Sequence, residues 1–226
     1  MTSHPGADQG RSEAKQGHQL SSAYIASMAL SFIDRFGLEA LSMRKLGSAL
    51  GVDPMTIYHY VPNKSALYDG VVDTIYGEVD FEVIDSDQNW RELVAQYIRR
   101  LHAVLRRHPK AVPLIATRPA YTPSVLTSGN RALRLLSDRG ISERDALLII
   151  NSLRSFSIGH VLAELGEPVG GSTESPESGD AVDWSRYPHM VKAMSGGYHG
   201  DEFHEIALQA MLDGFAARLP LLSGND

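Results

Sequence analysis

Residues 42–64 constrain the fold of this chain more than any other segment, because short apolar stripes alternate there with helix caps. Ser42 can cap a first helix whose apolar positions recur at spacings of three and four. Gly51 can end that helix, since glycine adopts positive φ at little cost. Asp53 can cap a second helix, and Pro54 fits its first turn because a missing N–H costs nothing there. The segment therefore predicts two short helices joined by a tight turn.

The second of these helices, residues 54–60, is suited to reading DNA. Its buried stripe is small, either Met55 or Ile57 with Val61, so most of its polar side chains can face outward. Such a helix fits the major groove, where hydroxyl and ring groups meet base edges and phosphates. Asn63 then caps a third helix, and Lys64 at its start can bind phosphate. The side chains expected to contact DNA are Arg44, Thr56, Tyr58, His59, Tyr60 and Lys64.

Helix pairs with a glycine in the turn also occur in proteins that never bind DNA, so the pattern alone leaves both interpretations open. The order of residues favours DNA, because it resembles the signature of the tetracycline-repressor (TetR) family of bacterial transcriptional regulators. The matching positions are Gly37, Leu41, Arg44, Lys45, Leu46, Leu50, Gly51, Val52, Thr56, Ile57, Tyr58, Tyr60, Val61, Asn63, Lys64 and Leu67.

A weaker similarity to the tetracycline repressors themselves continues downstream, so that the resemblance covers most of residues 21–219. It is found in Thr117-Arg118-Pro119, in residues 138–142, and at Gly159, Val161 and Leu162. The resemblance implies a ligand-responsive regulator, usually a repressor, that binds palindromic double-stranded operator DNA as a homodimer.

Helical periodicity predicts an all-α chain with a three-helix helix-turn-helix head and a larger helical body. The resemblance implies that this body binds a ligand and forms the dimer. We expect a flexible arm over residues 1–20, a DNA-binding domain over 21–68, and an effector-binding and dimerisation domain over 69–226. Arg11 and Lys15 of the arm could touch DNA, although a solvated tail is the favoured interpretation. A fourth helix from Asn63 to about Tyr76 is expected to pass from the head into the body.

Further helices are predicted throughout the body, whereas the alternation typical of strands is missing from the sequence. A flexible surface loop is expected between Gly166 and Pro188, because glycine, proline, serine and acidic residues are frequent there. The predicted body helices cover residues 90–107, 113–116, 123–138, 143–165 and 201–219, with a short one near Pro188.

The charge of the chain is unevenly distributed. The formal net charge is −6, whereas residues 1–65 carry six Lys/Arg and five Asp/Glu, which leaves about −7 on the remainder. A head so close to neutral should depend on a fitted dimeric site for its affinity.

The absence of cysteine fits a reducing cytoplasm. No apolar run approaches the roughly 18 residues of a membrane span, so we expect a cytoplasmic protein without membrane contact.

The helices predicted at 143–165 and 202–219 are apolar on two faces, which indicates burial on two faces. The resemblance implies that they form a four-helix dimer interface, with Leu212 taken as an outward-facing position. Burial of both faces within one monomer is the alternative, which the sequence leaves open. Two-fold reading of DNA favours the dimer.

The resemblance also implies a small-molecule pocket in the body, with Thr117, Arg118 and Pro119 as matching residues. Leu114 stands where the tetracycline repressors have a metal-binding histidine, and Ala163 where they have a glutamate. Because a magnesium–tetracycline chelate needs such hard ligands, a less polar or aromatic effector is expected. Helical spacing and partial correspondence add the pocket candidates Tyr97, Leu101, Leu105, Phe156 and His160, each of which could instead be a core residue.

Other polar residues can be explained without a catalytic or metal-binding role. His199, Asp201, His204 and Glu205 have a spacing that could ligate a metal, but acidic residues also belong at a helix N-terminus, so no metal site is predicted. His102 and His108 are expected on a solvated face of their arginine-rich helix.

Two other classes of function remain as alternatives. One is a dimeric small-molecule-binding protein whose DNA head is vestigial, and the other is an enzyme. The enzyme is disfavoured, because the sequence has no cysteine, no nucleophile elbow, no phosphate-binding glycine loop and no His-Glu-x-x-His. No cofactor is expected.

Overall fold

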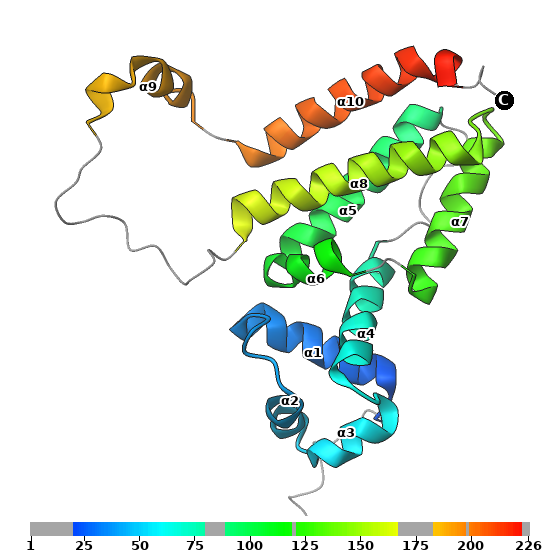
Figure 1. Cartoon of the computed structure of the whole chain (residues 1–226), viewed down its shortest axis with the longest axis vertical. Helices are drawn as coiled ribbons and strands as arrows, with labels where there is room; N and C mark the ends of the chain where they lie inside the picture. The colour runs from blue at the N-terminus through cyan, green and yellow to red at the C-terminus, as the bar shows by residue number, and fades with distance from the viewer. Residues whose placement is uncertain (1–19, 80–88, 119–120, 167–182, 198, 223–226) are drawn as a thin grey trace, which may run out of the picture.

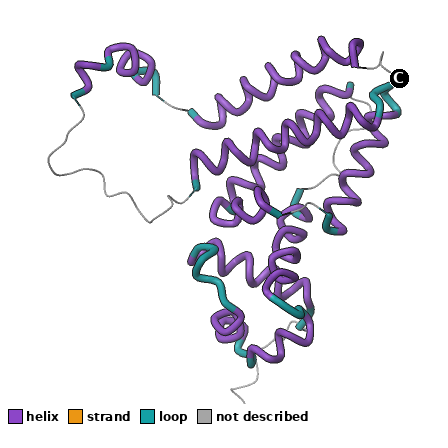
Figure 2. Tube along the Cα trace, in the orientation of Figure 1, coloured by secondary structure: helices purple, strands orange, loops and turns teal. Residues whose placement is uncertain are grey.

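The structure is a computed structural model that describes residues 20–79, 89–118, 121–166, 183–197 and 199–222. All regular elements in these ranges are helices, which confirms the all-α prediction (Figure 2). Most of the predicted arm and of the predicted loop, and also Pro119, lie outside the described residues. The elements are α1 (Ser22–Phe36), α2 (Met43–Leu50), α3 (Pro54–Tyr60), α4 (Lys64–Gly77), α5 (Trp90–Arg107), η1 (Pro109–Ala111), α6 (Val112–Thr117), α7 (Pro123–Ser137), α8 (Glu143–Leu165), η2 (Trp184–Arg186), α9 (Pro188–Met194) and α10 (Gly200–Leu222).

The helices α1, α2 and α3 form a small head at one end of the molecule (Figure 1). The N-terminus of α2 is capped by Ser42, whose Oγ accepts a hydrogen bond from the backbone N–H of Lys45 at 3.2 Å. Gly51 ends α2 with a φ of 69°, a left-handed conformation that favours glycine. The carboxylate of Asp53 accepts a hydrogen bond from Met55 N at 2.7 Å and so caps α3. The two short helices therefore begin and end where the sequence predicts.

The helix α4 connects the head to the body, because it packs against α1 at one level and against α5, α6 and α7 at another. Asn63 caps it by accepting a hydrogen bond from Ala66 N at 2.9 Å. Its apolar stripe is buried along its whole length, from Leu67 to Ile75. The helix α4 is therefore packed against both the head and the body.

His108 forms a second link between body and head. Its Nδ1 lies 2.8 Å from Asp34 Oδ2 on α1, and its Nε2 lies 3.1 Å from Glu78 Oε2 at the end of α4. These two hydrogen bonds, with that to Asp34 the larger cause, raise the pKa of the imidazole above 6.5. The expectation that His108 lies on a solvated face is wrong, because its side chain joins two carboxylates across the junction.

The body is organised around α8, which packs against α5, α6, α7 and α10. By length and composition alone α8 could cross a membrane, but Ile149, Leu153 and Val161 are buried among these neighbours, so it is the core helix of the body. Figure 1 shows α8 and α10 lying side by side, whereas α9 projects away from both.

The structure corrects two expectations about the faces of body helices. Leu212 was expected to face outward, but it is fully buried with Leu208 on the face of α10 that packs within the chain. His102 was expected in solvent, but it is buried in α5. It lies four residues after Ile98 and three before Leu105, which places it on an apolar face of the helix.

Candidate functional site

The helix α3 exposes most of its side chains at the end of the head. Ile57 is its buried anchor, whereas Met55 is exposed, which settles the choice between them. Tyr58 and Tyr60 retain 41% and 46% of their accessible surface, and His59 is also exposed. Phenol and imidazole groups presented in this way can donate to phosphates and to base edges.

The position of α3 is fixed by a close approach to α2. A Cβ added to Gly47 would lie 3.0 Å from the carbonyl oxygen of Val52 and 3.3 Å from Pro54, so a larger residue would push the two helices apart.

Arg44 lies exposed on α2 and Lys64 lies exposed at the start of α4, while Thr56 is partly buried. The six predicted DNA-contacting residues thus come from the consecutive helices α2, α3 and α4, and their contact with DNA stays a prediction.

Arg118, which follows α6, joins the body to the start of α4. Its Nε and Nη2 donate to Asp69 Oδ1 at 2.8 and 2.6 Å, and Nη2 also donates to Ser65 Oγ at 2.8 Å. Two cations lie near the Tyr68 ring, with Lys64 Nζ at 5.3 Å and Arg118 Cζ at 5.7 Å from its centroid. The body therefore holds the first turns of α4, the helix that follows α3.

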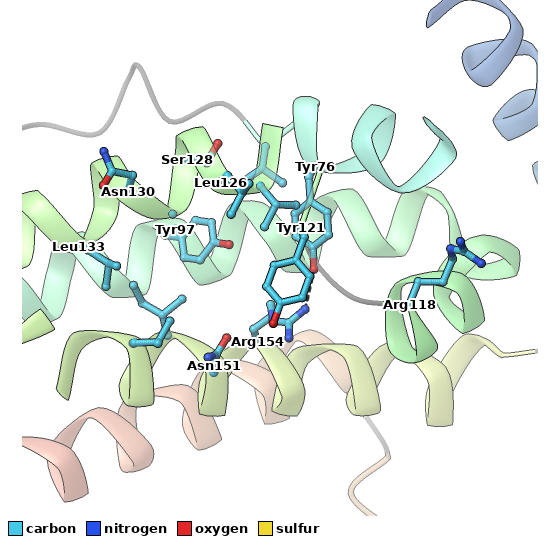
Figure 3. Close-up of a pocket in the computed structure, with 15 residues that line it drawn as sticks. Tyr76, Tyr97, Arg118, Tyr121, Leu126, Ser128, Asn130, Leu133, Asn151 and Arg154 are labelled. Carbon is cyan, nitrogen blue, oxygen red and sulfur yellow. Dashed lines mark hydrogen bonds between the residues drawn. The ribbon is translucent and has the colours of Figure 1, made fainter. Parts of the chain in front are cut away.

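A cavity of about 580 Å³ lies in the body, bounded by α4, α5, α7 and α8 (Figure 3). Its apolar wall consists of Val79, Val125, Leu126, Leu133, Leu147 and Ile150. Its polar lining includes Tyr76, Tyr97, Arg118, Tyr121, Asn151 and Arg154, and Asn130, Ser128 and Gly129 complete it. Tyr121 retains 80% of its accessible surface, so the cavity is open to solvent beside it. A cavity of this volume can hold a drug-sized molecule.

Of the predicted ligand-binding residues that the structure describes, Tyr97 and Arg118 line this cavity. Burial raises the pKa of the Tyr97 phenol, so it stays protonated at neutral pH. Leu101, Leu105 and Leu114 are core residues away from the lining. Thr117 is also outside it, with its hydroxyl donating to Pro113 O at 2.6 Å. Whether Tyr97 and Arg118 bind a ligand stays a prediction.

Phe156 and His160 belong instead to an aromatic cluster between α5, α8 and α10. The His102 and His204 rings are stacked with centroids 3.7 Å apart, and His160 meets them edge-on at 5.4 and 5.3 Å. His204 Nε2 lies 2.9 Å from Ser157 Oγ. Among the described residues, no group of three or more His, Cys, Asp or Glu could hold a metal ion. The aromatic cluster therefore packs the space between α5, α8 and α10 inside the body.

The sequence reasoning missed the polar residues at the centre of the cavity. Arg154 Nη1 donates to the hydroxyl of Tyr76 at 3.0 Å, and Figure 3 shows Tyr121 beside this pair. A signal for Arg154 was present, because it is the one cation in the apolar run from Ala146 to Val161. For Tyr76 and Tyr121 the sequence carries no such signal, since each could be an ordinary core or surface tyrosine.

Comparison with known proteins gives two family-model matches. Residues 25–71 match the model of bacterial regulatory proteins of the tetR family, and residues 85–219 match the tetracyclin repressor-like C-terminal domain. The two matches together cover the head and most of the body.

Individual relatives agree with these models. The chain is 33% identical to an HTH-type transcriptional regulator of Saccharopolyspora erythraea over 62% of its own length and 59% of that protein. It is 27% identical to the class E tetracycline repressor protein of Escherichia coli, covering 92% and 99% of the two chains. A solved structure of a possible TetR family transcriptional regulator from Streptomyces coelicolor A3(2) superposes with a TM-score of 0.73 at 27% identity, over 87% of this chain and 99% of that one.

Proposed function

This chain belongs to the tetracycline-repressor (TetR) family of bacterial transcriptional regulators, and we propose that it binds a palindromic operator as a homodimer in the cytoplasm. It is a ligand-responsive transcriptional repressor and not an enzyme. The observation that carries the proposal is that α4 joins an exposed recognition helix to an open cavity: its N-cap Asn63 follows the end of α3 at Tyr60 after a short turn, and Tyr76 lines the cavity.

The recognition helix α3 is too short to give specific affinity alone. Its 7 residues offer only a few side chains to one major groove. Two copies related by a two-fold axis would reach half-sites about 34–36 Å apart, one helical turn of DNA. Dimerisation therefore supplies the affinity that one nearly neutral head lacks.

The proposed dimer contact is the exposed apolar face shared by α8 and α10. Leu148 and Leu162 on α8 and Ile206 on α10 are exposed although they are large and apolar. Ala210, Gly214 and Ala217 are exposed farther along α10, and such small residues allow helices to approach closely. Large apolar side chains exposed on neighbouring helices are typical of a protein–protein contact.

The proposed response to ligand passes through α4. The body holds this helix at three levels: Arg118 binds Asp69, the backbone N–H of Ser124 donates to Asp73 at 2.8 Å, and Arg154 donates to Tyr76. A ligand that enters the cavity must displace part of this lining and so shift α4 and the recognition helix. A preference of a few kcal/mol for the displaced arrangement is enough to release the operator, and operator DNA must then weaken ligand binding equally.

The substitution Lys64→Ala tests the DNA-binding surface. Lys64 lies exposed at the N-terminus of α4, where its ammonium and the helix dipole can bind the same phosphate. We expect operator affinity to fall about tenfold, and the magnitude of the slope of log affinity against log salt to decrease by about two, one for each protomer of the dimer, as measured by fluorescence anisotropy. The matched control is Lys192→Ala, which removes the same charge from the exposed α9. Unchanged affinity and slope in Lys64→Ala would refute the phosphate contact.

A further inference from the structure

Arg154 presents a positive charge to the cavity without a carboxylate to balance it. Its Nη1 donates to the neutral hydroxyl of Tyr76 at 3.0 Å, and its Nε is buried without a hydrogen-bond partner. No Asp or Glu is among the described residues that line the cavity. A half-buried guanidinium with one buried, unpartnered N–H is left incompletely solvated, and a bound anion would relieve this cost.

Arg118 at the other end of the cavity shows the contrast. Its guanidinium is neutralised by Asp69 and, in Figure 3, is directed away from Arg154. The cavity thus contains one paired arginine with a structural role and one arginine whose charge remains available. Arginine suits this second role, because its planar fork matches a carboxylate or another oxyanion.

The surroundings of Arg154 indicate the rest of the occupant. Figure 3 shows Tyr76, Tyr121 and Arg154 close together, with the hydroxyl of Tyr97 directed toward this group. Aromatic rings and the aliphatic side chains of α7 and α8 provide flat apolar walls, which suit a planar ring system. Since Tyr97 is a protonated phenol, it does not supply the missing negative charge.

We propose that the effector is an aromatic acid, whose ring system lies among the tyrosines and whose anionic group binds Arg154. This inference rests on the proposed function of the cavity as the effector site. It predicts discrimination by charge, because a neutral compound with the same rings would leave the guanidinium unpaired.

Two fluorescent probes with one ring framework test the proposal on the full-length protein. The anion is 8-anilinonaphthalene-1-sulfonate, and N-phenyl-1-naphthylamine is the same framework without the sulfonate. We expect Arg154→Met to weaken binding of the anion about 10- to 100-fold, the usual scale for a charge-assisted hydrogen bond, and to change binding of the neutral probe less than about threefold. Arg154→Lys should retain part of the preference for the anion. Arg144→Met, an exposed position on the same helix, is the matched control.

The variant Gly129→Phe shows whether the probes occupy the cavity. Gly129 lines the cavity and a Cβ there would meet nothing within 4 Å, so a phenylalanine can fold into the empty space. This variant should abolish binding of both probes. If both probes still bind to Gly129→Phe, the cavity is not the binding site and the proposed function of the cavity fails together with this inference. If Gly129→Phe blocks both probes but Arg154→Met weakens them equally, the effector site stands and the aromatic-acid proposal is refuted.

Discussion

Replacing Ile206 by glutamate is expected to convert the protein into monomers and to weaken operator binding about 100-fold or more. Ile206 retains 59% of its accessible surface within one chain and lies on the apolar face of α8 and α10. In a dimer this side chain would be buried, and an unpaired carboxylate buried there costs several kcal/mol. Light scattering at micromolar protein concentration measures the mass, and anisotropy measures DNA binding.

The matched control for this experiment is Arg134→Glu, a charge change at an exposed position of α7. It should leave the dimer intact. Leu212→Glu is not a test of the interface, because Leu212 is buried in its own chain and the variant would destabilise the monomer. A wild-type protein that is monomeric at micromolar concentration, or an Ile206→Glu variant that remains a dimer, would contradict the proposed interface.

Acid is expected to destabilise the protein through the stacked histidines His102 and His204. Burial is the main reason that the pKa of both rings is lowered from 6.5 to about 4, and the neighbouring histidines lower it further. Arg106 also lowers the pKa of His102. Asp201 acts against the shift of both pKa values, and Glu205 acts against that of His204. In the unfolded chain these rings become protonated near pH 6.5, but in the folded protein they stay neutral until about pH 4. The contribution of these two neutral rings to the free energy of unfolding is therefore fully present above their pKa in the unfolded chain. It is lost as the pH falls toward their pKa in the folded protein.

The free energy of unfolding is expected to fall by roughly 3 kcal/mol for each ring once the pH lies below the pKa of the folded state. This is a large share of the stability of an ordinary domain. His108 acts in the opposite direction. Because the pKa of His108 is raised in the folded protein, its contribution to the free energy of unfolding is fully present below pH 6.5. That contribution is lost as the pH rises through the pKa of the folded state. The loss between pH 6.5 and 4 therefore does not come from His108.

Urea unfolding measured at pH 7 and at pH 4.5 tests this prediction. His102→Phe keeps an aromatic ring against His204 but removes one titrating group, so the difference between the two pH values should shrink by about half. His189→Phe, on the exposed α9, is the matched control and should retain the whole difference. A His102→Phe variant with the full difference would contradict the assignment to the buried pair.

The head could be predicted from sequence almost residue by residue, because local interactions determine it. Ser42, Asp53 and Asn63 each make the capping hydrogen bond that their side chain and spacing predict. Gly51 takes the left-handed conformation that only a residue without a Cβ adopts easily. Such signals extend over three or four residues, which is the range that a sequence shows directly.

The cavity could not be predicted in this way, because its residues come from four helices that are far apart in sequence. Tyr97 and Arg118 were found through spacing and resemblance, whereas Arg154 and Tyr76 meet only after α4 and α8 have both packed against α5 and α7. Periodicity shows which face of a helix is apolar but not which neighbour covers it. For the same reason Leu212 was placed on the wrong face, since both faces of α10 are apolar.

Selection of duplexes from a random DNA pool by the full-length wild-type protein tests the central claim most directly. The account predicts enrichment of palindromes whose two half-sites are centred about 34–36 Å apart, each palindrome bound by one dimer. It also predicts that Lys64→Ala retains the same sequence preference with lower affinity, because phosphate contacts carry little sequence information. Failure to enrich any sequence, as expected for a small-molecule-binding protein with a vestigial head, or enrichment of single half-sites without two-fold symmetry, would contradict the account.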